Sequence, residues 1–156
     1  PLRVTHNDTK LNNVLIDEAT GEGICIIDLD TTMPGLSIYD FGDSIRFGAN
    51  HSAEDEKDLS KVNFDIELYR IYPRGFLEGA AGGLTDAELE YLPWGAKLMT
   101  LECGIRFLTD YLDGDNYFHI RYADQNLDRT RTQFKLVSDM EQQWDEMHKI
   151  VREIAQ

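Results

Sequence analysis

The first forty residues constrain the fold of this chain more than any other part. Residues 13–17 (NVLID) form a short apolar run, residues 19–23 (ATGEG) are typical of a turn, and residues 24–29 (ICIIDL) form a β-branched run suited to a buried strand. A β-hairpin is the simplest connection between two such strands. Two acidic residues, Asp28 and Asp30, then fall where the second strand ends.

Helical periodicity begins after this hairpin. Ser37, followed three residues later by Asp40, resembles a capping box and predicts a helix that starts at Ser37. Residues 51–60 are charged and lack an apolar period, so we expect a solvated loop. Residues 65–82 carry apolar side chains on one helical face, although Pro73 should kink that helix.

Three further helices are predicted in the second half of the chain. Thr85 and Glu88 form a capping box that opens a short helix ending near Pro93. Residues 98–112 have leucines and isoleucines at spacings of three and four, and residues 127–154 have Val, Met, Trp and Ile at the same spacings. No internal repeat or linker-like tract divides the chain, so a single domain over residues 1–156 is expected.

Composition limits the possible partners. The 156 residues are enough for one core, and the formal net charge of −14 repels phosphate backbones and anionic lipids, so neither nucleic acid nor a membrane is expected. No apolar run approaches the roughly 18 residues of a membrane span. Cys25 and Cys103 are far apart and outside any C-x-x-C spacing, which argues against a disulfide framework or a zinc site. A reducing, cytoplasmic setting fits best.

One group of polar residues has the chemistry of phosphoryl transfer. The opening stretch contains H-x-D-x4-N at His6, Asp8 and Asn13, and the second strand ends in I-D-x-D at Asp28 and Asp30. Phosphoryl transfer needs a carboxylate to orient or accept the proton of the attacking hydroxyl, and oxygen ligands to hold Mg²⁺. Each motif alone is common, but their order and spacing together are not.

At these residues the sequence resembles the aminoglycoside phosphotransferase and choline kinase superfamily, whose catalytic loop is H-x-D-x4-N and whose metal motif is I-D-x-[DE]. That family has the protein-kinase fold. More narrowly, four segments resemble the N-acetylhexosamine 1-kinases, which phosphorylate the anomeric hydroxyl of GlcNAc or GalNAc. These segments are HNDTKLNNVLID, IIDLDTTMPGLSIYDFGDSIRFGA, GAKLMTLECGIRFLTDYLDGDNYF and NLDRTRTQFKLV.

The resemblance implies a role for each motif residue. Asp8 would be the catalytic base, and Asn13 and Asp28 would be ligands of Mg²⁺, with ATP as the co-substrate. Asp30 would be a second acidic group at the metal or substrate, or only a cap of the next turn. Two further residues would be structural: His6 would brace the loop, and Asp40 would accept hydrogen bonds from backbone N–H groups of the loop.

Sugar recognition is expected from the helical part of the chain. The resemblance makes Arg46, Arg106, Tyr117 and Trp144 candidates for substrate binding, because sugar hydroxyls bind to Arg and Tyr and a sugar ring stacks on an aromatic side chain. Each has a plainer alternative. Arg46 can simply pair with Asp43, Arg106 can pair with an acid on its own helix, Tyr117 can close a loop, and Trp144 lies on an apolar stripe typical of a core.

The resemblance also implies an α+β fold that is predominantly α-helical, namely the C-terminal lobe of a protein-kinase-like fold with a small hairpin that carries both motifs. No Gly-rich loop and no strand-borne Lys precede Pro1, so the nucleotide-binding lobe is expected to be absent and the chain alone to be inactive. Exposed apolar residues at 14–16 and 24–27 would then favour self-association.

Three alternatives stay open at this point. The acceptor could be an aminoglycoside, choline, homoserine or methylthioribose. The chain could also be a kinase-like module that binds without catalysis. A sulfatase-like hydrolase is disfavoured, because the segment from Cys103 to Arg106 lacks the C-x-P-x-R arrangement that such a nucleophile needs.

Overall fold

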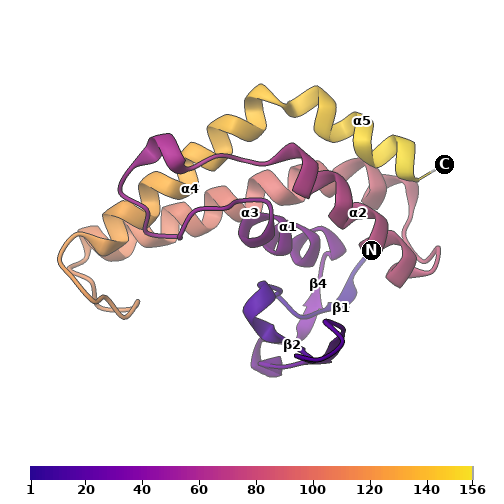
Figure 1. Ribbon diagram of the computed structural model, residues 1–156, viewed down its shortest axis with the longest axis horizontal. Coiled ribbons are helices and arrows are strands. Elements are labelled where there is room, and N and C mark those ends of the chain that lie inside the picture. Colours follow the sequence, from indigo (N-terminus) through magenta and orange to yellow (C-terminus); the bar gives the residue numbers. More distant parts are fainter. Residues whose placement is uncertain (156) are drawn as a thin grey trace.

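The computed structural model describes residues 1–155, and within them two small β-ladders lie on one side of a helical layer (Figure 1). The strands are β1 (Arg3–Thr5), β2 (Val14–Ile16), β3 (Gly23–Ile26) and β4 (Met33–Gly35). The helices are α1 (Ser37–Gly48), α2 (Ile66–Ala80), α3 (Asp86–Leu112), α4 (Gln125–Gln142) and α5 (Trp144–Ile154). The predicted class, α+β and predominantly helical, is confirmed.

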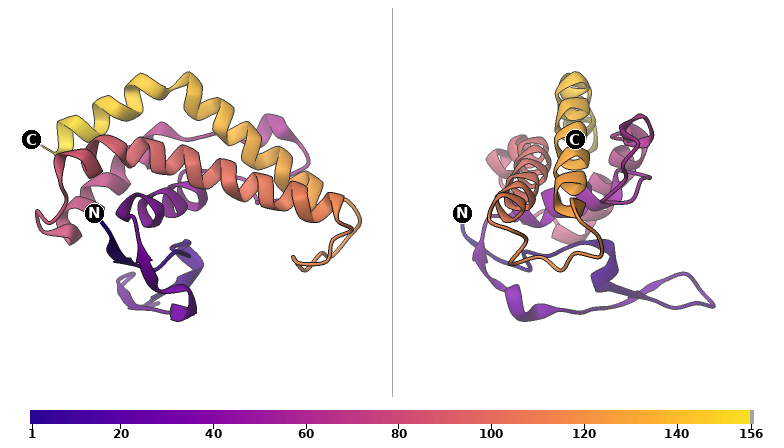
Figure 2. Two further views of the ribbon diagram at one scale, coloured as in Figure 1. Left: turned by 180° about the vertical axis from the view of Figure 1, so that it is seen from behind. Right: turned by 90° about the vertical axis from the view of Figure 1, so that its left-hand side faces the viewer.

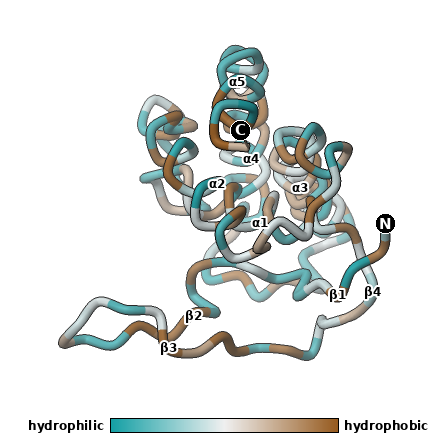
Figure 3. Tube along the Cα trace, turned by 90° about the vertical axis from the view of Figure 1, so that its right-hand side faces the viewer, coloured by the Kyte–Doolittle hydropathy of each residue, from teal (hydrophilic) through white to brown (hydrophobic). Residues whose placement is uncertain are grey.

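The two β-ladders are both antiparallel. Strands β2 and β3 form the predicted hairpin, with Val14 opposite Ile26 and an irregularity beside Ile16, and each strand is shorter than its apolar run. The hairpin extends away from the helices (Figures 2 and 3). The second ladder, between β1 and β4, was not predicted from the sequence, because strands of three residues are too short to show a period of two.

Helix α1 starts at Ser37 as predicted, but the predicted capping box is wrong. The N-cap residue is Leu36, which makes no side-chain cap. The Ser37 hydroxyl instead donates to Glu88 Oε1 on α3 (2.8 Å), and the Asp40 carboxylate accepts hydrogen bonds from the loop after β1. Both side chains therefore tie α1 to other elements.

The segment between α1 and α2 is a loop closed at its base. Asn50 and Phe64 form an isolated antiparallel bridge, so the residues between them leave and return at one point. The expectation of a wholly solvated loop over residues 51–60 is wrong for Glu54, whose carboxylate accepts a hydrogen bond from Arg46 Nη1 (2.9 Å). The loop thereby contributes a half-buried carboxylate that pairs with the buried Arg46.

Two prolines lie inside helices without ending them. Helix α2 continues through Pro73 and packs its predicted apolar face on the core. Helix α3 opens with the predicted capping box of Thr85 and Glu88, but the prediction that it stops near Pro93 is wrong, because it continues to Leu112. A proline removes one hydrogen bond and strains the turn before it, at about 3 kcal/mol. Pro93 is buried, and packing of α3 on α1 offsets that strain.

Helices α1 and α3 cross at two glycines. A Cβ atom on Gly42 would lie 2.2 Å from the carbonyl oxygen of Gly95, and a Cβ on Gly95 would lie 2.2 Å from the carbonyl oxygen of Ile38. The two backbones therefore touch with no room for a methyl group. This crossing sets the position of α1 against the rest of the helical layer.

The predicted single helix over residues 127–154 is wrong, because the structure has two helices separated at Gln143 (Figure 1). Gln143 has φ −107° and ψ 17°, and its side-chain amide donates to the carbonyl of Phe64 (3.2 Å). Helix α4 then packs along α3, whereas α5 packs on α2 and α3. An uninterrupted three-and-four spacing does not reveal such a break.

The core lies among all five helices and the end of the loop before α2. Its buried apolar side chains are Phe41, Ile45, Ala49, Val62, Phe64, Tyr69, Leu92, Ala96, Leu136, Met140, Met147, Ile150 and Val151. None of the helices in the described part of the chain combines the length and apolarity needed to cross a lipid bilayer.

Strand β1 is fixed to α3 by a carboxylate with several donors. Glu88 is 7% exposed and accepts hydrogen bonds from Arg3 Nε (2.9 Å) and Nη2 (2.7 Å), from Ser37 and from Thr85. The hydrogen bonds from Arg3, with those from Thr85 and Ser37, hold the pKa of Glu88 well below its usual range. Folding therefore favours the ionised form of Glu88 over its protonated form.

We expect Glu88→Gln to lower the free energy of unfolding by about 3 kcal/mol at pH 7, because the Arg3 guanidinium loses its charged partner. Since the folded pKa is depressed, this contribution is present above the unfolded pKa of about 4.3 and is lost as the pH falls further. Urea unfolding between pH 7 and 2 should show the variant and wild type converging. Glu90→Gln, on an exposed residue of the same helix, is the control. A gap that stays constant with pH would contradict the prediction.

Candidate active site

Residues 6–13, which we call the catalytic loop, connect β1 to β2. The His6 ring lies across it: the Asp8 amide donates to His6 Nδ1 (3.3 Å), and His6 Nε2 lies 3.0 Å from the carbonyl oxygen of Ile27. These two partners assign the proton to Nε2, because Nδ1 accepts and Nε2 faces an acceptor. The imidazole thus joins the loop to the segment after β3.

Asp40, in the first turn of α1, holds the start of the catalytic loop. Its carboxylate accepts from the backbone N–H of His6 (2.9 Å) and of Asn7 (2.8 Å). Asn7 has φ 64°, a left-handed conformation that asparagine tolerates. Thr9 Oγ1 donates to the Asp40 carbonyl (2.6 Å), which anchors the middle of the loop to the same helix.

The Asp8 carboxylate is held by two neighbours. Lys10 Nζ and Asn13 Nδ2 both donate to Asp8 Oδ2, at 2.8 and 2.9 Å, and the side chain remains partly exposed. Partial burial works to raise the pKa of Asp8, but the hydrogen bonds from Lys10 and Asn13 outweigh it, and the pKa lies below its usual value. Asp8 is therefore ionised at neutral pH and can accept a hydrogen bond from a hydroxyl group.

Asn13 contacts Asp8 directly, and Asp28 follows a residue that is bonded to Asn13. The Asn13 amide nitrogen donates to both the main chain and the side chain of Asp8, which leaves its Oδ1 free to bind a cation. The Ile27 amide donates to the Asn13 carbonyl (2.9 Å), so Asp28 follows a residue bonded directly to Asn13. Asp28 has φ 64° and an exposed side chain.

Asn13 and Asp28 offer an amide oxygen and a carboxylate, the kinds of oxygen ligand that Mg²⁺ prefers. Mg²⁺ in nucleotide sites is bound by one or two protein oxygens, with phosphate and water completing the octahedron. Among residues 1–155, no three His, Cys, Asp or Glu side chains gather closely enough to hold a metal by themselves. Asp30 lies in the turn Leu29–Thr31 beyond Asp28, and it too is exposed.

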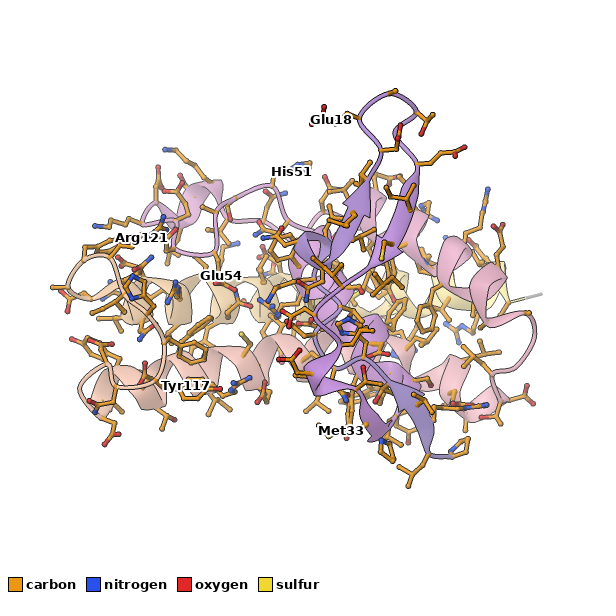
Figure 4. All side chains as sticks on the ribbon, turned by 90° about the horizontal axis from the view of Figure 1, so that it is seen from below. Glu18, Met33, His51, Glu54, Tyr117 and Arg121 are labelled. Atoms are coloured by element: carbon orange, nitrogen blue, oxygen red, sulfur yellow. The ribbon has the colours of Figure 1, made fainter. Side chains whose placement is uncertain are left out.

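A pocket of about 740 Å³ opens beside Asp8. Its walls come from the catalytic loop, α1, α3, the loop after α3, Glu54 and Arg129. Figure 4 views this side of the molecule and shows Glu54 and Tyr117 over α4 and α3, well apart from Glu18 at the tip of the hairpin. Three of the four predicted substrate residues, Arg46, Arg106 and Tyr117, line this pocket.

Trp144, the fourth predicted substrate residue, lies elsewhere in the structure. It is not among the pocket's lining residues. Its ring packs edge-on against Trp94 on α3 (4.8 Å between centroids) and against His148 on its own helix α5 (4.9 Å). Trp144 therefore belongs to the border of the core, as its apolar stripe alone would have indicated.

The floor of the pocket is a buried set of paired charges. Arg46 is 8% exposed; its Nε donates to Asp43 Oδ1 and its Nη1 to Glu54 Oε1, both at 2.9 Å. Burial works to lower the pKa of Arg46, but the carboxylates of Asp43 and Glu54 work against it, and the pKa of Arg46 lies above its usual value. Burial also raises the pKa of the Cys103 thiol to about 11, so Cys103 is neutral at pH 7 and a poor nucleophile.

The rim of the pocket is aromatic. The Arg106 guanidinium lies 5.8 Å from the ring centroid of Tyr117 and 5.4 Å from that of Phe118. Asp110 fixes this rim, because its carboxylate accepts from the backbone N–H groups of Tyr117 (2.8 Å) and Phe118 (2.9 Å). Tyr117 is 74% exposed, so one face of its ring is open to a ligand.

The charges around the pocket balance, in contrast to the net charge of −14 for the chain. Four acidic and four basic side chains line it: Asp8, Asp43, Glu54, Glu102, Lys10, Arg46, Arg106 and Arg129. Sequence reasoning missed Glu54 and Arg129 as pocket residues. Glu54 lies in a charged loop without periodicity, and Arg129 is one of several charged residues at the start of α4, so nothing local distinguished them.

A second cavity, of about 640 Å³, lies between β1 and α2. It shares Asp40 with the loop anchor, but no residue of the catalytic loop lines it. Its walls are mostly apolar or glycine, including Val4, Ile71 and Gly75. Of these two cavities, the pocket beside Asp8 is the more polar.

A helical layer with a small hairpin that presents such a loop beside a pocket is consistent with the C-terminal lobe of a kinase-like fold. The comparison with known families agrees. Residues 1–74 match the family model described as "Phosphotransferase enzyme family" (APH). The matched stretch includes the catalytic loop, both β-ladders and α1, and it supports a phosphotransferase of the APH superfamily.

Proposed function

We propose that the chain is the catalytic and acceptor-binding lobe of an ATP-dependent kinase whose acceptor is a sugar hydroxyl, namely the anomeric hydroxyl of an N-acetylhexosamine (GlcNAc or GalNAc). One observation carries the proposal: Asp8 lines the same pocket as Arg46, Arg106 and Tyr117. A hydroxyl bound in that pocket can reach the carboxylate, while the family match supplies the reaction class.

The chain's own residues would then act as follows. Asp8 accepts the hydrogen bond of the attacking hydroxyl, orients it and takes its proton as the bond to phosphorus forms; such positioning is the main protein contribution to phosphoryl transfer. Asn13 and Asp28 would hold Mg²⁺, which neutralises charge on the nucleotide phosphates. His6 and Asp40 hold the loop in position. Asp30 would be a further acidic group at the metal or the substrate.

The exposed apolar side chains of the hairpin are an argument for a second, nucleotide-binding lobe that would pack on them. Ile24 and Ile26 on β3 are 63% and 61% exposed, and Ile16 and Leu29 beside them are also exposed. Apolar side chains gathered in this way usually mark a contact surface. We propose that the nucleotide binds between this surface and such a lobe, with its phosphates directed at Asn13 and Asp28.

The pocket's charges favour a neutral acceptor. A polycationic aminoglycoside requires an excess of carboxylates, whereas this lining is balanced. Choline requires an aromatic cage free of competing cations, whereas Arg46, Arg106 and Arg129 all face this pocket. A hexosamine presents hydroxyls for the charged groups and a ring face for Tyr117, so it fits the set best.

We expect the full-length phosphotransferase to transfer labelled phosphate from ATP to GlcNAc or GalNAc, and not to choline, homoserine or an aminoglycoside. Arg106→Ala should raise KM for the sugar about tenfold or more and leave KM for ATP unchanged, because a charged hydrogen-bond donor is lost from the acceptor side only. Arg152→Ala, an exposed arginine in the last turn of α5, is the control.

Two outcomes would contradict this assignment. If the enzyme phosphorylates another acceptor and no hexosamine, the proposed acceptor is wrong, while the proposed phosphoryl transfer stands. Sugar binding by isothermal titration calorimetry without transfer to any acceptor would instead indicate a binding module.

A further inference from the structure

One oxygen at the floor of the pocket has no partner. Asp43 is 6% exposed and lines the pocket, and its Oδ2 is buried without a hydrogen bond from any described residue. Its Oδ1 accepts from Arg46 Nε at 2.9 Å. Buried carboxylate oxygens are normally satisfied, so an unpaired one beside a cavity indicates a donor supplied from outside the chain.

The neighbouring cationic side chains do not donate to this oxygen. Arg46 divides its guanidinium between Asp43 and Glu54. Arg129 also faces Glu54. Its Nε lies 3.7 Å from Glu54 Oε2 and is buried without a hydrogen bond. The ion pairs therefore hold Asp43 rigidly and leave its second oxygen for a ligand.

We propose that Asp43 binds the acceptor, with Oδ2 accepting a hydrogen bond from a sugar hydroxyl other than the one that is phosphorylated. This inference rests on the proposed function, because it assigns a partner within the same pocket. An ionised carboxylate only accepts hydrogen bonds, so the ligand must be a donor at this point. Asp43 thus becomes a specificity residue that rejects acceptors lacking this hydroxyl, as sites built around a buried polar group do.

The test combines changes in the protein with changes in the sugar. Binding of GlcNAc and of its 3-deoxy, 4-deoxy and 6-deoxy analogues to the full-length protein is measured by isothermal titration calorimetry. For wild type, one deoxygenation should weaken binding roughly 10- to 100-fold. For Asp43→Ala, GlcNAc itself should bind that much more weakly, and the same deoxygenation should then change Kd less than about threefold.

Two controls keep the result interpretable. Asp43→Asn preserves the shape of the side chain, so it tests the carboxylate if the alanine variant does not fold. Glu146→Ala removes a carboxylate paired with Arg70 (2.7 Å) on the far side of the helical layer and should leave sugar binding unchanged.

The outcomes separate this inference from the function it rests on. Equal deoxygenation penalties in wild type and in both Asp43 variants would overturn the role of Asp43, while sugar binding and transfer by wild type would still stand. Absence of hexosamine binding by wild type would overturn both.

Discussion

Asp8→Asn should abolish measurable phosphate transfer to the sugar, with kcat lowered about 10³-fold or more. The amide has the size of the carboxylate but cannot take the proton of the attacking hydroxyl, and proton transfer by a positioned group contributes about 10²- to 10⁴-fold. Lys10 and Asn13 hold the Asp8 carboxylate in one orientation, which the amide of the variant can keep only in part. Transfer of labelled phosphate from ATP to GlcNAc is the measurement.

The variant should stay folded and keep its affinity for the sugar. Asp58→Asn, a partly exposed capping residue in the loop before α2, is the matched control and should turn over like wild type. Turnover by Asp8→Asn close to that of wild type would exclude Asp8 as the base. A parallel loss of sugar binding and of the thermal transition would show a structural role instead.

Gly42→Ala should lower the free energy of unfolding by about 3 kcal/mol, at the upper end for one methyl group forced into a packed interior. The added Cβ would meet the Gly95 backbone at 2.2 Å, and a backbone cannot move aside as a flexible side chain can. The helices would have to separate. Since α1 carries both Asp40 and Asp43, transfer activity should fall with stability.

A matched glycine shows whether this effect is specific to the crossing. Gly75 lies inside α2, and an added Cβ there would meet nothing from the rest of the chain within 4 Å, so Gly75→Ala should stabilise the protein by up to about 1 kcal/mol through helix propensity. Urea unfolding of the three proteins gives both values. Equal stability of Gly42→Ala and wild type would contradict the close packing of α1 on α3.

Local sequence patterns predicted the elements that are determined by contacts between residues close together in the sequence. The hairpin follows from two apolar runs around a turn, and the start of α3 follows from Thr85 and Glu88, which satisfy each other within one turn. The errors concern contacts between distant segments. Pro93 is tolerated because α3 packs on α1, and α4 ends at Gln142 where the next side chain bonds to Phe64.

The candidate site divides in the same way. The arrangement of His6, Asp8 and Asn13 could be predicted, because one loop carries all three residues. Asp28 follows Ile27, whose amide is bonded to the Asn13 carbonyl beside the hairpin. The pocket could not be predicted in full. Glu54 and Arg129 reach it from opposite parts of the chain, and their positions depend on how the loop before α2 lies against α4.

The bridge between Asn50 and Phe64 brings together the two ends of the segment that connects α1 to α2. Val62 within this segment belongs to the core, so the part that can vary in length and composition while α1 and α2 keep their positions lies before it. Glu54, in that part, pairs with Arg46. We therefore expect that exchanging residues 51–58 as one unit would alter acceptor preference and leave the catalytic loop unchanged.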